Sequence, residues 1–414
     1  MSENLFAYAI SNYVNSQAGA ITGSRSTSSV DTAAAKAKIT GLNGDAAFFN
    51  FFDHSSSRLV LRQYNVANPE DLINNRIIQP QGNWAVPLAS QTWAAVRNLH
   101  AVATKGNWLY ATGYDLGKIA VVNMTSNAYT QAATSYDFPL TVTGDVHGEG
   151  LAVIGDYLYA LFSSNPEGGY EVYADSYVLQ YIINATTGAL TFSSSVRVGR
   201  NGFTLEPWGN QLYICALGGM QNAGSGNALT RLSIVTIDED DEMSVNNVAL
   251  PTGWAGDFRD ISIANANNAY VFVGHYNSSF SAMEGKIYRS TVADLASPST
   301  TNWTVVDNVN SGGYFWGIQA ESTPSRFWFV RGNQIDAYSS LPTTTGGTPT
   351  SFNAAALNDA DYTEINSACF IAPDAPAAKM AAGTAAASAK GFVGQARLAR
   401  QAKALADELK KKNP

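Results

Sequence analysis

Short segments in which apolar and polar residues alternate, separated by turns containing Gly, Asn and Asp, recur along most of this chain. The segment "GNWLYATGYDLGKIAVVN", residues 106–123, shows the unit: an aromatic-rich run, a loop and a second alternating run. Alternation with enrichment in Tyr, Val, Ile and Phe is typical of β-strands. Related units begin near residues 44, 155, 209, 267 and 325. Helical periodicity is absent before the far C-terminus, so the pattern predicts an all-β protein.

The aromatic residues at the centre of these units define a period. They lie about 50 to 58 residues apart: Tyr110, Tyr159, Tyr213, Tyr270 and Trp328. One period holds four strand-like runs, as in "GEGLAVIG", "YLYALFSS", "SYVLQYII" and "ALTFSSSVRV". A repeat of this length with four strands is typical of one blade of a β-propeller, so we predict a propeller over residues 1–373.

The number of blades depends on how the two ends of the chain are used. Six periods are visible, beginning near Ala33. The leftover runs are "NLFAYAIS" and "GAITGSRS" at the N-terminus and "TEINSACFIAP" at the C-terminus. Joined, they would form a seventh four-stranded blade, with its innermost strand from the C-terminal end. Because that arrangement leaves no open sheet edge, we predict seven blades, with six as the alternative.

Composition narrows the classes of partner. Charged residues make up 14% of the 414 residues, against about 25% in an average protein, and the formal net charge is −8. This balance argues against nucleic acid as a partner and favours an extracellular, cell-surface or periplasmic location. No apolar run is long enough to span a membrane, and the first 16 residues do not have the pattern of a signal peptide. Cys215 and Cys369 lie in apolar runs and are predicted to be buried free thiols.

The second unit, "LYATGYDLGKIAVVNMTSNAYT", resembles the YVTN-type repeat of bacterial surface and secreted β-propellers, within the lactonase-like propeller superfamily. Asn123 stands where that repeat has Asp. The third unit matches less closely and the others only weakly. The resemblance implies a propeller fold, and a set of relatives that includes surface-layer-like proteins, lactonase-like enzymes and quinone-dependent enzymes.

Polar residues that open the first strand of each blade are candidates for the central channel. A ring of oxygen ligands at one depth could hold Ca²⁺ or Mg²⁺. Resemblance to lactonase-like propellers implies that such a metal would polarise an ester carbonyl while a side chain moves the proton. Under this metal-dependent hydrolase or lyase hypothesis the base is His147 or His100, and the metal ligands are Glu149, Asn201, Asp260 and Asn366.

Long loops between second and third strands support a different hypothesis. Three consecutive loops, 163–176, 218–228 and 274–285, are rich in Tyr, Asn, Ser and Gly, a mixture that suits adaptable binding surfaces. Their aromatic residues are candidates for stacking on sugars or peptide side chains: Tyr170, Tyr173, Tyr276 and Phe280. We therefore predict a non-catalytic propeller that binds a glycan or protein, and keep the metal-dependent enzyme as the alternative.

The last 41 residues, 374–414, differ from the rest. Here Ala and Lys dominate, and eight Lys or Arg face three Asp or Glu. The sequence predicts a linker followed by a basic helix at roughly residues 391–411. That helix could dock on the propeller, on another chain or on a membrane surface.

Overall fold

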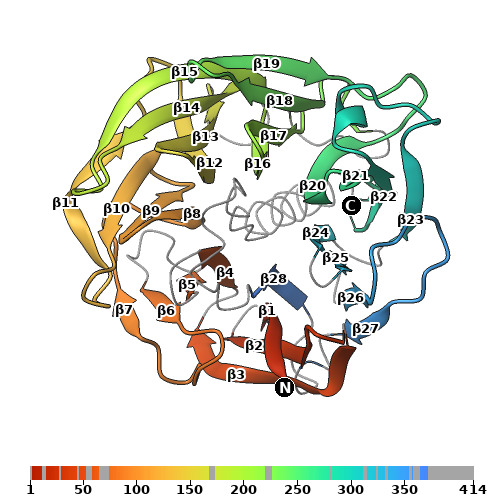
Figure 1. Cartoon of the computed structure of the whole chain (residues 1–414), viewed down its shortest axis with the longest axis horizontal. Coiled ribbons are helices and arrows are strands. Elements are labelled where there is room, and N and C mark those ends of the chain that lie inside the picture. The colour runs from red at the N-terminus through yellow and green to blue at the C-terminus, as the bar shows by residue number, and fades with distance from the viewer. Residues whose placement is uncertain are drawn as a thin grey trace, which may run out of the picture.

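The protein is a ring of seven four-stranded antiparallel sheets in this computed structural model (Figure 1). The structure describes residues 2–371 except 12–14, 28, 44–45, 53–57, 65–73, 167–172, 220–225, 280, 311–314, 323–324, 332–333, 354–356 and 358–363. A short 3₁₀ helix, η1 (Ala293–Ala296), lies between β22 (Met283–Ser290) and β23 (Thr304–Asn310). Within the described residues no helix is both long and apolar enough to cross a membrane. The predicted linker and helix of residues 374–414 lie outside the described residues.

Six blades use consecutive strands. Blade 1 contains β4 (Ala46–Phe52), β5 (Arg58–Tyr64), β6 (Asn75–Ile78) and β7 (Ala89–Gln91). Blade 2 contains β8 (Leu99–Lys105), β9 (Trp108–Gly113), β10 (Lys118–Asn123) and β11 (Thr130–Asp137). Blade 3 contains β12 (Asp145–Ile154), β13 (Tyr157–Asn165), β14 (Asp175–Ile183) and β15 (Leu190–Arg200). Blade 4 contains β16 (Gly202–Trp208), β17 (Gln211–Ala216), β18 (Arg231–Ile237) and β19 (Met243–Val248). Blade 5 contains β20 (Asp257–Asn265), β21 (Asn268–Tyr276), β22 (Met283–Ser290) and β23 (Thr304–Asn310). Blade 6 contains β24 (Phe315–Ser322), β25 (Ser325–Arg331), β26 (Gln334–Tyr338) and β27 (Thr350–Asn353).

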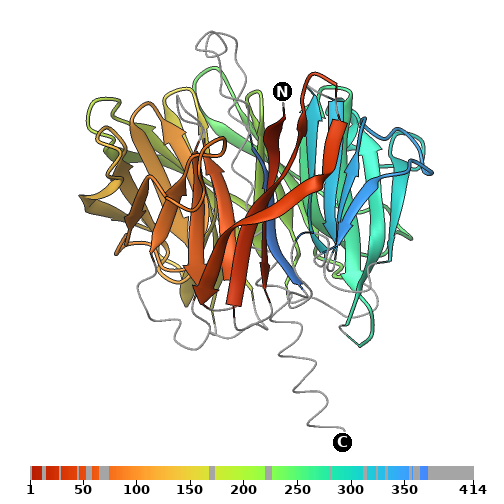
Figure 2. The same ribbon diagram turned by 90° about the horizontal axis from the view of Figure 1, so that it is seen from below.

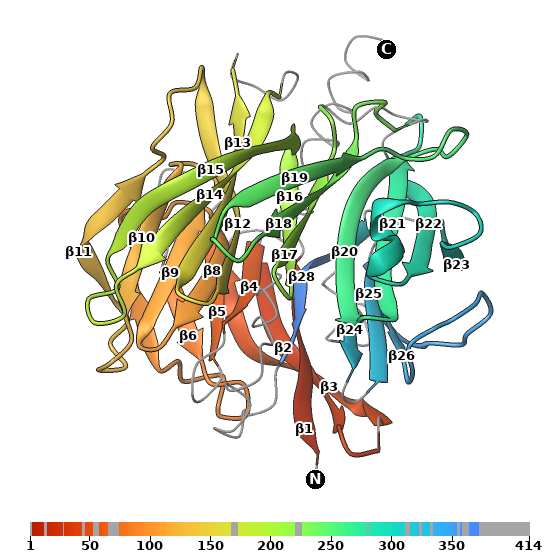
Figure 3. The same cartoon turned by 45° about the horizontal axis from the view of Figure 1, so that its top comes forward.

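The seventh, closing blade joins the two ends of the chain, as the sequence predicted. Its order is β28-β1-β2-β3, with β28 (Glu364–Phe370) innermost and β1 (Glu3–Ser11), β2 (Asn15–Ser24) and β3 (Ser29–Asn43) outside it. Figures 2 and 3 show β28 alongside β1, far from it in sequence. This pairing closes the ring between the blades that begin and end the consecutive series.

The start of the first complete blade differs from the prediction. Residues from Ala33 belong to β3, the outermost strand of the closing blade, and blade 1 begins at Ala46. The run "AAFFNFF", which looked like a second strand, is β4, the first strand of blade 1. Aromatic-rich runs are second strands elsewhere in the chain, so the aromatic residues of this run led to the wrong prediction.

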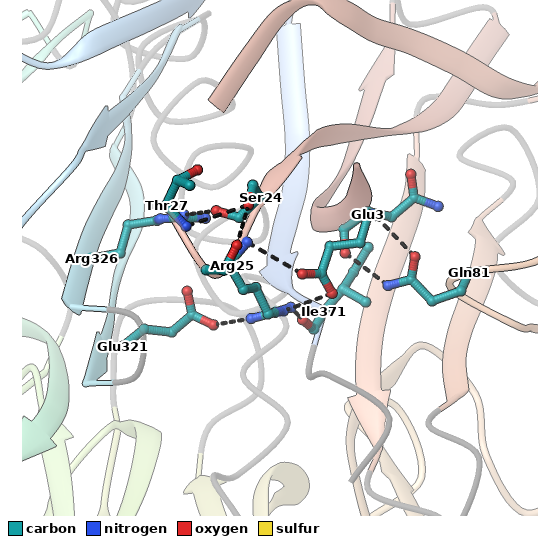
Figure 4. A network of polar contacts seen from close by, with 10 residues as sticks. Glu3, Ser24, Arg25, Thr27, Gln81, Glu321, Arg326 and Ile371 are labelled. Carbon is teal, nitrogen blue, oxygen red and sulfur yellow. Dashed lines mark hydrogen bonds and ion pairs between the residues drawn. The ribbon is translucent and has the colours of Figure 1, made fainter. Parts of the chain in front are cut away.

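Partly buried charged side chains hold the closing blade against blade 6 (Figure 4). Arg25, in the turn between β2 and β3, forms ion pairs with Glu321 of β24 at 2.7 Å and with Glu3 of β1 at 3.3 Å. The same guanidinium donates to the carbonyl of Ile371, just after β28. Burial raises the pKa of Glu321, opposed by Arg25. Arg326 of β25 donates to the carbonyl of Ser24 at 3.2 Å in the same cluster, so two residues of blade 6 meet residues from both ends of the chain there.

A repeated aromatic position fills the core of the blades. Tyr110, Tyr159, Tyr213, Tyr270 and Trp328 all lie on second strands and are at most 1% exposed. Two of their hydroxyls donate to carbonyls of the next blade: Tyr110 to Gly188 at 3.1 Å and Tyr270 to Pro342 at 3.0 Å. Since burial disfavours the charged phenolate, it raises the pKa of Tyr213 to about 12. The predicted period thus corresponds to one structural role.

The two cysteines are buried free thiols, as predicted. Cys215 lies on β17 and Cys369 on β28. Burial raises the pKa of the Cys369 thiol, which keeps it protonated and unreactive at neutral pH.

Candidate functional site

A β-bulge interrupts the innermost strand of six of the seven blades within the described pairings. At each bulge one residue has no partner on the second strand, and the strand bends around it. These extra residues are His100, Glu149, Phe203, Arg259, Trp316 and Asn366. Each lies within the first half of its strand, toward the ring face that carries the connections between second and third strands. A bulge changes the direction in which the side chain of its extra residue points. These six positions are therefore candidates for functional residues.

Two consecutive bulge residues contact each other. His100 Nδ1 of blade 2 lies 3.1 Å from Glu149 Oε2 of blade 3, and the two side chains are 2% and 0% exposed. Ser163, opposite on β13, donates its hydroxyl to the other carboxylate oxygen of Glu149 at 2.8 Å. An ionised carboxylate only accepts hydrogen bonds, so the proton of the neutral imidazole lies on Nδ1. The basic lone pair of His100 is then on Nε2.

His147 has the same tautomer for a different reason. Its Nδ1 lies 2.8 Å from the carbonyl oxygen of Tyr114, which can only accept, so Nδ1 carries the proton. The Tyr114 ring stacks on this imidazole with centroids 3.8 Å apart and planes 5° from parallel. The same ring lies 5.3 Å from the His100 ring. Two imidazoles, one carboxylate and one tyrosine therefore form a cluster at the seam of blades 2 and 3, which we call the His–Glu cluster (His100, Tyr114, His147, Glu149 and Ser163).

Two glycines let the blades approach closely enough to build this cluster. A Cβ on Gly148 would lie 2.0 Å from Thr112 Oγ1 of blade 2. A Cβ on Gly150 would lie 2.8 Å from the Cβ of Leu205 in blade 4. Both separations are shorter than atoms allow, so the segment "HGEG" brings Glu149 between its neighbours because no side chain stands on either side of it.

The equivalent bulges of blades 4 and 5 are used differently. Phe203 is 5% exposed and packs in the apolar core shared by these two blades. Arg259 is fully buried and pairs with Asp257 at 2.9 Å, while its Nε donates to the carbonyl of Gly274 at 3.1 Å. Burial raises the pKa of Asp257, opposed chiefly by the charge of Arg259. These positions therefore stabilise the interior.

The other predicted carboxylate ligand, Asp260, joins two blades. Its Oδ2 accepts the backbone N–H of Ile318 in blade 6 at 2.7 Å, and its Oδ1 accepts that of Ile261 at 2.9 Å. Glu206 does the same one blade earlier, accepting the N–H of Ile263 at 3.0 Å. Inner-strand carboxylates in this half of the ring thus hold neighbouring first strands together.

The two predicted amide ligands have separate positions. Asn201 lies in the turn before β16 with φ of 52°, a left-handed conformation, and its side chain donates to the carbonyl of Gly219 at 2.9 Å. The backbone of Asn366 lies at the bulge of β28.

The structure describes the hydrogen bonds of the two carboxylates among the four predicted metal ligands. Both oxygens of Glu149 and of Asp260 already accept hydrogen bonds from groups that a metal would have to displace. Among the described residues no group of three or more His, Cys, Asp or Glu could hold a metal ion. A bound Ca²⁺ or Mg²⁺ stays a prediction, and no step below is routed through one.

The structure describes two of the four predicted loop aromatics, and both are buried. Tyr173 is 3% exposed and Tyr276 is 1% exposed, with the Arg259 guanidinium 5.3 Å from the Tyr276 ring centroid. Buried rings of this kind have no face to offer a sugar or a peptide. Tyr170 and Phe280 lie outside the described residues.

Comparison with solved structures agrees with this geometry at the level of the fold. A Lactobacillus plantarum protein matches with a TM-score of 0.53 and 12% identity over 82% of this chain and 92% of its own. A periplasmic gluconolactonase of Pseudomonas aeruginosa matches with a TM-score of 0.54 and 11% identity over 90% and 99%. These likenesses show that the chain shares its β-propeller fold with both proteins. No protein-family model and no curated protein matches its sequence.

Sequence reasoning found His100, His147 and Glu149 but missed two members of the cluster. Ser163 was placed at the junction of a predicted second strand with the loop 163–176, and Tyr114 in a predicted loop within blade 2. A signal for the pairing was present, because His100 and Glu149 are 49 residues apart, the same separation as Tyr110 and Tyr159. Residues one period apart lie at the same depth on adjacent blades.

Proposed function

We propose that this propeller is a hydrolase of small polar esters or lactones, with the His–Glu cluster as its catalytic site. The observation that carries the proposal is the contact between His100 and Glu149, two ionisable side chains at consecutive bulges. A buried acid–base pair on re-aimed positions is a feature of catalytic sites. The fold shared with a gluconolactonase supports a sugar lactone as the first substrate to test.

The chemistry follows from the tautomers. Nε2 of His100 is buried in this structure, so the scheme requires the ester and one water molecule to enter the cluster together. Nε2 then takes a proton from that water as the water oxygen attacks the carbonyl carbon of the ester. The carboxylate of Glu149 stabilises the imidazolium that forms, because the opposite charge lies one hydrogen bond away. The C–O bond of the lactone ring then breaks, and the imidazolium returns the proton to the leaving oxygen. The product is the open hydroxy acid.

His147 has a positioning role in this scheme. It is 9% exposed, more than either His100 or Glu149, and Tyr114 fixes its orientation by stacking and by its carbonyl. Its Nε2 is therefore presented in a fixed direction to a polar group of the substrate. We further propose that the protein works outside the cytoplasm, by analogy with the periplasmic gluconolactonase.

The test is lactone hydrolysis followed by acid release, with glucono-δ-lactone and simpler five- and six-membered lactones as substrates. Glu149→Gln keeps the shape of the side chain and removes its charge, so we expect the rate to fall roughly 10²–10⁴-fold. Glu206→Gln is the matched control: its amide oxygen still accepts the N–H of Ile263, and activity should be kept. Absence of hydrolysis by the native protein across these substrates would contradict the proposal.

A further inference from the structure

A cavity of about 680 Å³ lies on the outer part of blade 5, away from the His–Glu cluster. Figure 1 places β22 and β23, which form one wall, on the far side of the ring from β8 and β12. The segment between β19 and β20 forms the other wall. The volume of the cavity is within the range of sites that bind small ligands. We call this cavity the blade 5 groove.

Aromatic rings form the floor of the blade 5 groove. Trp254, half-buried, stacks on Tyr288 with centroids 4.2 Å apart and planes 11° from parallel. Trp303 meets the edge of Trp254 at 6.1 Å and is itself 2% exposed. The contacts with Tyr288 and Trp303 restrict the orientation of the Trp254 ring. A fixed indole loses little conformational entropy on binding.

Polar groups of both signs line the same groove. Glu284 and Lys286 are exposed, two residues apart on β22, and therefore point to the same side of the sheet. Within the described part of the chain neither forms an ion pair. His275, directly across from Glu284 on β21, and the hydroxyls of Thr300 and Thr304 add further hydrogen-bonding groups.

We propose that the blade 5 groove binds a neutral oligosaccharide of two or three sugar units. A sugar ring has an apolar face of C–H groups that suits a flat indole, and a rim of hydroxyls that can both donate and accept. Glu284 would accept from such hydroxyls and Lys286 would donate to them. An anionic ligand would meet Glu284 and a cationic one would meet Lys286, so the paired signs favour a ligand without charge. This site is independent of the proposed hydrolase activity.

Isothermal titration calorimetry of the full chain with maltotriose, cellotriose, xylotriose, mannotriose and chitotriose tests the proposal. We expect at least one to bind with a Kd below about 1 mM. Trp254→Ala should weaken that binding at least about tenfold, and Lys286→Ala, at an exposed position that does not endanger folding, should weaken it severalfold. Trp108→Ala is the matched control, since Trp108 is also half-buried but lies in blade 2, and it should leave the affinity unchanged.

Three results would overturn the proposal. The first is that none of the five sugars binds at millimolar concentration. The second is that a sugar binds equally well to the native protein, Trp254→Ala and Lys286→Ala. The third is that Trp108→Ala weakens binding as much as Trp254→Ala, which would show a general loss of folded protein instead of a lost site.

Discussion

The seam between blades 2 and 3 and the seam between blades 4 and 5 use the same backbone device for different ends. In both, a bulge near the start of each inner strand re-aims one residue. At the first seam those residues are His100 and Glu149, which contact each other. At the second they are Phe203 and Arg259, which enter the core and a buried ion pair. The backbone of the bulge is therefore the same at both seams, and the residue type at the bulge determines which contacts form there.

The largest effect should come from breaking the ion pair of the blade 5 bulge. Arg259→Met leaves Asp257 buried without its counter-charge, and the free energy of unfolding should fall by about 3–5 kcal/mol. Urea denaturation followed by circular dichroism measures this loss. Glu149→Gln is the comparison at the other seam, and its loss of stability should be much smaller. Equal losses at the two seams would contradict the division of roles.

A smaller effect is expected where blades 2 and 3 approach. Gly148→Ala forces Thr112 to move, together with the hydrogen bond that its hydroxyl donates to the carbonyl of Lys118 at 2.7 Å. Overpacking of this kind costs about 1–3 kcal/mol. Thermal denaturation should show the loss, and adding Thr112→Ala should recover most of it. If Gly148→Ala is neutral, the close approach is not needed to form the seam.

The smallest effect concerns pH. Burial raises the pKa of Asp257 above its usual 3.8, so the folded protein holds this proton to a higher pH than the unfolded chain does. Its contribution to stability is fully present below the unfolded pKa and is lost as pH rises through the folded pKa. Asp257→Asn removes this dependence. The stability of the native protein relative to that variant should therefore fall as pH rises from about 3.8 in paired denaturation curves.

Much of the fold could be predicted because it repeats. Five second-strand aromatics mark the period, and the unpaired strands at the two ends predicted the closing blade. The start of the first blade was predicted wrongly because this first strand is also rich in aromatic residues: Phe48, Phe49, Phe51 and Phe52. Repetition does not distinguish between strands that share the same composition.

The site was less predictable, because its members depend on contacts between blades. Asp260 has the sequence context of a channel ligand, but its partner, the N–H of Ile318, lies 58 residues away. Tyr276 looks like a loop aromatic and packs beside Arg259 instead. Trp254, Tyr288 and Trp303 share no repeat position, so no periodicity connects them. Such contacts become visible only when the blades are placed side by side.

The central claim is that His100 and Glu149 act as one catalytic unit. A double-mutant cycle on lactone hydrolysis with His100→Gln, Glu149→Gln and the double variant tests it most directly. If the two residues act together, the double variant should be about as slow as His100→Gln alone. Losses that multiply, or a Glu149→Gln variant as active as the native protein, would show that the contact at the seam of blades 2 and 3 has no part in catalysis.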